Sequence, residues 1–153
     1  MNKWEFEKKI NKNIFVASTS TRPSIIISNY SNVLTSSSGT FSRDGGSGTM
    51  YYYHAIEVRV NTTGTYTFKS SSSFDTYGYL YQGNFYPSYP SYNIISRDDD
   101  TAGNSQFQLT ASLRSDITYI LVFTTYSERI TTAFSIIASG PDDVIFNQIY
   151  SNN

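Results

Sequence analysis

Apolar and polar residues alternate with a period of two along much of this chain. In the segment 51–60 (YYYHAIEVRV), Ile56 and Val58 face one way while Glu57 and Arg59 face the other. Such alternation, with β-branched and aromatic residues, is typical of a half-buried strand. The same pattern predicts further strands at 65–70, 76–83, 106–113 and 131–139.

One segment has no alternation. Residues 118–126 (TYILVFTTY) are almost continuously apolar, which predicts a central strand covered on both faces. Strands at intervals of about 10–12 residues with polar turns between them indicate a sandwich or barrel. We therefore expect an all-β fold, an antiparallel β-sandwich that is jelly-roll-like. The predicted core comprises Ile56, Val58, Val60, Tyr66, Phe68, Leu80, Phe107, Leu109, Leu113, Leu121, Phe123, Phe134 and Ile136.

The regular pattern does not begin before residue 50. Residues 13–18 (NIFVAS) and 24–28 (SIIIS) are two apolar strand candidates, and the Ser/Gly-rich stretch 35–49 that follows is typical of a flexible loop or linker. We predict three parts, an N-terminal extension (1–49), a sandwich (50–140) and a strand-like tail (141–153). The extension's apolar residues are candidates for donation to a neighbouring molecule's sheet: Ile14, Val16, Ile25, Ile26 and Ile27. The alternative is that these strands fold back and complete the sandwich of their own chain.

The composition is polar without being charged. Charged residues make up 15% of the chain and aromatic residues 16%, with 14 tyrosines. A net charge of −1 argues against a nucleic-acid partner, and no apolar run approaches the roughly 20 residues that a membrane-spanning helix needs. This composition favours a secreted or cell-surface module. Residues 1–12 show no signal peptide, so we expect that a leader was removed before this numbering begins.

Catalytic chemistry has few candidate residues. Cysteine is absent and His54 is the single histidine, which excludes a thiolate nucleophile and a multi-histidine metal site. His54 shares its face with Ile56, so we expect a core or rim histidine. The glycine cluster at 45–48 matches neither a nucleophile elbow nor a phosphate loop. We predict a protein that is not an enzyme.

Residues 52–140 resemble the pre-peptidase C-terminal domain, a β-sandwich appended to secreted peptidases and found in other extracellular proteins. The matching pieces, in order, are YHAIEVRV with GTYTF, FDTYGYLYQGNF, ISRDDDTAGNSQFQLTASL and DITYILVFTTY. Two features depart from the pattern: Asp116-Ile117 stands where many members have Ala-Gly or Pro-Gly, and residues 1–49 have no counterpart. The resemblance implies the sandwich fold and, as in some members, structural calcium.

The acidic run is the candidate metal site. Asp98, Asp99 and Asp100 are adjacent carboxylates, and oxygen ligands suit Ca²⁺. Asp75 is expected to lie near them if the strands pair as predicted. The run fails as an EF-hand loop because its twelfth position is Leu109. The alternative is a solvated turn without a cation.

The tyrosine-rich stretch that follows residue 76 has two interpretations. Exposed Tyr79, Tyr81, Tyr86 and Tyr89 would form a face that stacks on sugar rings. The alternative is a ladder of cross-strand tyrosines that only covers a sheet.

Two further features bear on the surroundings of the protein. Asn29 and Asn61 begin N-x-S/T sequons, which are glycosylation sites if the protein is secreted by a eukaryotic cell. For function we expect a structural subunit of an extracellular fibre or adhesive layer, whose partner is another copy of the chain. The alternatives are a carbohydrate- or matrix-binding module and an accessory domain of an enzyme.

Overall fold

The computed structural model describes residues 24–149, which form strands and loops without a helix. The strands are β1 (Ile26–Leu34), β2 (Thr40–Phe41), β3 (Tyr51–Tyr52), β4 (His54–Val60), β5 (Gly64–Ser72), β6 (Thr76–Gln82), β7 (Ile94–Asp98), β8 (Gln108–Leu113), β9 (Tyr119–Thr125), β10 (Thr132–Gly140) and β11 (Val144–Gln148).

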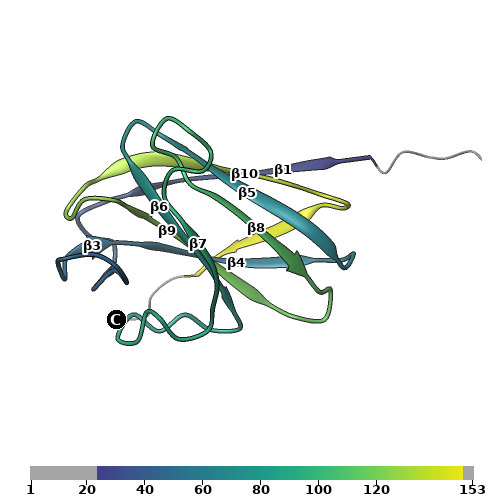
Figure 1. Ribbon diagram of the computed structural model, residues 1–153, viewed down its shortest axis with the longest axis horizontal. Coiled ribbons are helices and arrows are strands. Elements are labelled where there is room, and N and C mark those ends of the chain that lie inside the picture. The colour runs from purple at the N-terminus through teal and green to yellow at the C-terminus, as the bar shows by residue number, and fades with distance from the viewer. Residues whose placement is uncertain (1–23, 150–153) are drawn as a thin grey trace, which may run out of the picture.

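Two antiparallel sheets pack face to face (Figure 1). The four-stranded sheet has the order β1-β10-β5-β8, and the five-stranded sheet has the order β11-β4-β9-β6-β7. From β4 onward the chain changes sheet at every connection except the β6–β7 hairpin. This alternation gives the jelly-roll connectivity. The predicted all-β jelly-roll-like sandwich is confirmed.

The core lies between these two sheets. All thirteen residues of the predicted core are buried. Phe123 of β9 and Phe134 of β10 stack across the two sheets with ring centroids 3.8 Å apart and planes within 7°. Every residue of β9 is buried, as expected for a central strand covered on both faces.

A second apolar cluster covers the outer face of the five-stranded sheet. Phe41 and Tyr51 come from the small β2–β3 sheet and pack against Tyr79, Tyr81 and Val122. The segment 35–53 therefore forms a third layer over part of this sheet, which is why β9 is covered on both sides.

The N-terminal boundary differs from the one predicted. Residues 26–34 form β1, an edge strand of the sandwich that pairs with β10 along its whole length, from Ile26 opposite Gly140 to Leu34 opposite Thr132. The sandwich therefore begins at Ile26 and not at residue 50. Residues 13–18 lie outside the described part of the chain.

The stretch 35–49 is also not the flexible linker that its serines and glycines predicted. Phe41 is buried in the second cluster. Arg43 is buried too, with its guanidinium over the rings of Tyr51, Tyr77 and Tyr126. Two well-anchored side chains hold this segment on the sheet despite its composition.

The remaining elements complete the edges of the five-stranded sheet. β11 confirms the predicted strand in the C-terminal tail and pairs with β4. β7 was not predicted; it pairs with β6 through a register shift after Leu80. No helix of residues 24–149 is long and apolar enough to cross a membrane.

Candidate functional site

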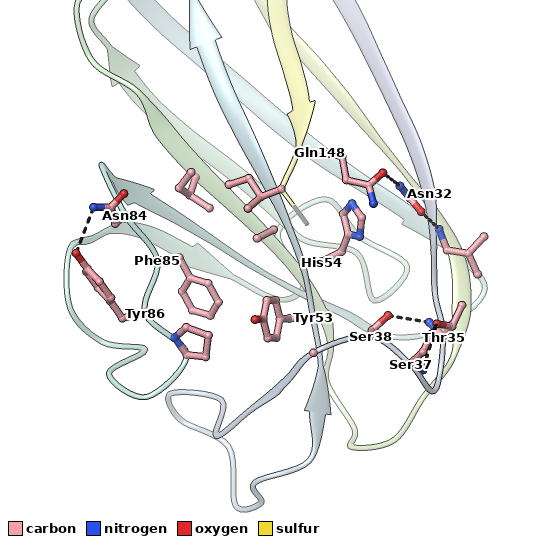
Figure 2. Close-up of a pocket in the computed structure, with 16 residues that line it drawn as sticks. Asn32, Thr35, Ser37, Ser38, Tyr53, His54, Asn84, Phe85, Tyr86 and Gln148 are labelled. Carbon is pink, nitrogen blue, oxygen red and sulfur yellow. Dashed lines mark hydrogen bonds between the residues drawn. The ribbon is translucent and has the colours of Figure 1, made fainter. Parts of the chain in front are cut away.

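A groove with a volume of about 730 Å³ opens at one end of the sandwich. It is bounded by the end of β1, the start of β4, the end of β11 and the loop between β6 and β7 (Figure 2). Its volume falls in the range of pockets that bind small ligands, about 300–1,000 Å³.

Tyr53 and Phe85 form the aromatic part of the groove (Figure 2). Their ring centroids lie 5.1 Å apart in an edge-on arrangement, and Phe41 meets both rings from the second cluster. Gly39 makes this position possible, because a Cβ atom there would lie 2.8 Å from the Tyr53 ring. Burial raises the pKa of the Tyr53 hydroxyl above its ordinary value, because the charged phenolate is disfavoured there.

Asn32, His54 and Gln148 line the opposite wall, and hydrogen bonds that pass through Tyr30 behind it connect these side chains. Asn32 Nδ2 donates to Gln148 Oε1 at 3.2 Å and to the Tyr30 hydroxyl at 3.0 Å. That hydroxyl lies 2.7 Å from His54 Nε2. Burial lowers the pKa of His54 to about 4, which leaves the imidazole neutral near pH 7. His54 is buried and hydrogen-bonded beside the groove, in line with the expected core or rim histidine.

Two amide groups in the groove keep unused hydrogen-bonding capacity. Gln148 accepts from Asn32 through Oε1, and no described residue accepts a hydrogen bond from its Nε2. Asn84 donates once, to the Tyr86 hydroxyl, and its Oδ1 has no described donor. The two exposed amides are at opposite ends of the groove (Figure 2).

The groove carries no formal charge. Its lining residues include no aspartate, glutamate, lysine or arginine among the described side chains, and His54 is neutral at pH 7. Such a site offers no opposite charge to compensate a charged ligand for the water it loses on binding. It is matched instead to a neutral molecule with an apolar face and several hydroxyl or amide groups.

The tyrosines predicted to bind sugars separate into two groups. Tyr79 and Tyr81 are fully buried in the second cluster, so the prediction that they form an exposed face is wrong. The cause is the segment 35–53, whose aromatic residues lie over them. Tyr86 and Tyr89 are exposed on the loop between β6 and β7.

The sequence did not identify four further residues that line the groove. Asn32, Tyr53, Asn84 and Gln148 come from four separate regions, and the groove exists only because β1 and β11 meet near the start of β4. An excess of asparagine and tyrosine was visible in the sequence, but no local motif links these positions.

The acidic residues are arranged differently from a preformed metal site. The Asp98 carboxylate accepts hydrogen bonds from Thr101 N, Thr101 Oγ1 and Gln108 N, so it stabilises its own loop. Desolvation, followed by the charges of Asp100 and Asp99, raises the pKa of Asp75. Asp75 therefore lies within electrostatic range of this loop, as expected.

Calcium at this loop stays a prediction. Among the described residues, no three histidine, cysteine, aspartate or glutamate side chains converge as a metal-binding group.

The other predicted sites lie on the surface of the sandwich. Asn29 is on the outer face of β1 and Asn61 follows β4; both are exposed. Of the assembly candidates, Ile25 and Ile27 are exposed and Ile26 is half-buried where β1 begins. Ile14 and Val16 lie outside the described residues.

Comparisons with known proteins add little to this geometry. No model of a protein family matches the chain, and no curated protein is similar to it. Among solved structures, the crystal structure of the Yersinia pseudotuberculosis-derived mitogen (YPM) is similar, with 14% sequence identity and a TM-score of 0.47. That match covers 77% of this chain and 88% of the mitogen chain.

Proposed function

We propose that this protein is a non-enzymatic, extracellular carbohydrate-binding module whose ligand site is the groove at the end of the sandwich. One observation carries the proposal: aromatic rings and unused amide groups meet in an uncharged groove of about 730 Å³. A sugar ring has an apolar C–H face and a rim of hydroxyls, so it can use both kinds of surface at once.

Each wall has a distinct role in this proposal. The rings of Tyr53 and Phe85 provide apolar contact area at a low cost in side-chain entropy. The amides of Gln148 and Asn84 each present a donor and an acceptor to hydroxyls at the two ends of the groove. The Asn32–Tyr30–His54 network fixes the position of Gln148 before the ligand arrives.

A glycan array followed by titration calorimetry tests the proposal. We expect binding to neutral glycans and a loss of about five-fold or more in affinity for Gln148→Ala and Asn84→Ala, since a ligand hydrogen bond contributes about 1 kcal/mol or more. Asn147→Ala is the matched control, because Asn147 is an exposed amide next to Gln148 whose side chain bonds Glu57 outside the groove. Absence of binding to every neutral glycan would contradict the proposal.

Self-association in an extracellular fibre is a second candidate. The observation that favours it is the edge of the four-stranded sheet, where β1 has no charged residue and exposes Ile27 and Val33. An uncharged edge strand is a template on which a neighbouring chain can pair. Electron microscopy of the purified protein tests this, with filaments as the supporting result.

A further inference from the structure

Three exposed tyrosines lie next to the groove on the loop between β6 and β7. Tyr86, Tyr89 and Tyr92 keep 42%, 72% and 61% of their surface exposed. With Ser91 they line a second, shallow hollow, and the rings of Tyr86 and Tyr92 are 6.1 Å apart. We call these three residues the tyrosine platform.

The loop that carries the tyrosine platform is held in place at several points. Phe85 packs into the second cluster, 5.0 Å from the Tyr81 ring and 5.1 Å from the Tyr53 ring. The buried Tyr81 hydroxyl donates to the Pro90 carbonyl at 2.7 Å. Successive turns close between Tyr86 O and Tyr89 N and between Tyr89 O and Tyr92 N. The platform is therefore ordered without a ligand, which lowers the entropic cost of binding to it.

Tyr86 connects the platform to the groove. Its side chain lines both hollows, and its hydroxyl accepts a hydrogen bond from Asn84, one of the two groove amides (Figure 2). The residues lining the second hollow, Tyr86, Tyr89, Ser91 and Tyr92, are also uncharged. The two surfaces thus share a wall and the same chemistry.

We infer that the groove and the tyrosine platform form one extended site, which binds a neutral oligosaccharide along several consecutive sugar units. This inference rests on the proposed function and adds the class of ligand, an oligosaccharide and not a single sugar. One part of the oligosaccharide lies in the groove between Gln148 and Asn84. The oligosaccharide then passes Tyr86, and its next sugar units stack on Tyr89 and Tyr92.

Affinity for chains of increasing length tests the inference. The probes are cello-, xylo-, malto- and galacto-oligosaccharides of one to six units, titrated by calorimetry. For the series that binds, we expect the affinity to rise by 10-fold or more between the shortest bound sugar and the longer chains and then to level off. Stacking of a sugar on each further tyrosine supplies this gain.

A double variant, Tyr89→Ala with Tyr92→Ala, separates the platform from the groove. We expect it to bind the shortest sugar as the wild type does and to lose the gain for longer chains. Both side chains are exposed, so the fold should be retained, and circular dichroism checks this. Phe74→Ala is the control for removing an exposed aromatic ring elsewhere, since Phe74 lines neither hollow.

The outcomes distinguish the inference from the proposed function. Equal affinity for all chain lengths, or a double variant that keeps the full gain, would overturn the extended site. If Gln148→Ala still weakened binding in that case, the groove would remain a carbohydrate site. Failure of every series to bind would overturn both.

Discussion

The stacked pair Phe123 and Phe134 bridges the two sheets within the core. Replacing a buried phenylalanine by alanine removes its contacts and leaves a cavity, which costs roughly 3–5 kcal/mol. We therefore expect Phe134→Ala to lower the free energy of unfolding by about that amount, and Phe134→Leu to lower it less. Urea denaturation measures both. A loss below about 1 kcal/mol for the alanine variant would contradict the stacked arrangement.

His54 makes stability depend on pH in one direction. Its pKa is lowered by burial from 6.5 to about 4, so the unfolded chain binds the proton more tightly than the folded chain. The free energy of unfolding is therefore expected to fall as the pH drops from about 6.5 to about 4, with the full contribution present above pH 6.5. His54→Gln, which retains a donor and an acceptor, should flatten this part of the pH profile. An unchanged slope in thermal unfolding would show that another group titrates there.

Asp75 has the opposite effect. Desolvation, followed by the charges of Asp100 and Asp99, raises its pKa, and its Oδ1 is buried without a partner. The Asp75 carboxyl group therefore favours folding when it is protonated. This contribution to the free energy of unfolding is lost as the pH rises through the raised pKa. We expect Asp75→Asn to have a higher melting temperature than the wild type at pH 7, with the difference disappearing below the ordinary carboxyl pKa.

The same pair of proteins tests the calcium prediction. If Ca²⁺ binds beside Asp75, adding millimolar Ca²⁺ at pH 7 should raise the melting temperature of the wild type more than that of Asp75→Asn, and excess chelator should reverse the rise. Equal melting curves with Ca²⁺ and with chelator would leave the solvated-turn interpretation of this loop.

At the scale of elements, Arg43 anchors the layer that closes over the second cluster. Its guanidinium lies 4.3 Å from the Tyr77 ring centroid and 5.0 Å from the ring centroids of Tyr51 and Tyr126. Each desolvated contact of this kind contributes about 1–2 kcal/mol. We expect Arg43→Ala to release the segment 35–53, with faster amide hydrogen exchange there and little change in the strands of the core. Arg43→Lys should give an intermediate effect, because a lysine lacks the planar stacking surface.

The sequence predicted elements where the pattern is local. β4, β5, β9 and β10 were expected because period-two alternation or a continuous apolar run defines them without reference to the rest of the chain. The extent of β1 was missed because the polar Asn32 faces inward and the apolar Val33 faces outward, which breaks the alternation near the end of the strand. β7, with the sequence IISRD, runs directly into the acidic turn and shows too little alternation to be recognised.

The groove could be predicted less well than the core, because its residues meet only through tertiary contacts. Alternation does establish which residues share a face, and this was enough for the core. It does not show that the segment 35–53 returns over the five-stranded sheet. For that reason the prediction of an exposed Tyr79 and Tyr81 was wrong, since both side chains are covered.

For the whole molecule, the role of the N-terminal strand decides between a closed monomer and an exchanging assembly. β1 is the edge strand of the four-stranded sheet and pairs with β10 of its own chain across nine residue pairs. Its inward side chains contact the core: Leu34 is fully buried, and Tyr30 packs against Phe134 and Phe146. We therefore expect deletion of residues 1–32 to remove cooperative thermal unfolding, because it exposes the edge of β10 and opens the core. Deletion of residues 1–23 is the matched control and should retain it, since that variant keeps all of β1. If the shorter chain 33–153 instead remained a folded monomer, while the full chain formed filaments under the electron microscope, β1 would be a donated strand and the fibre would become the leading function.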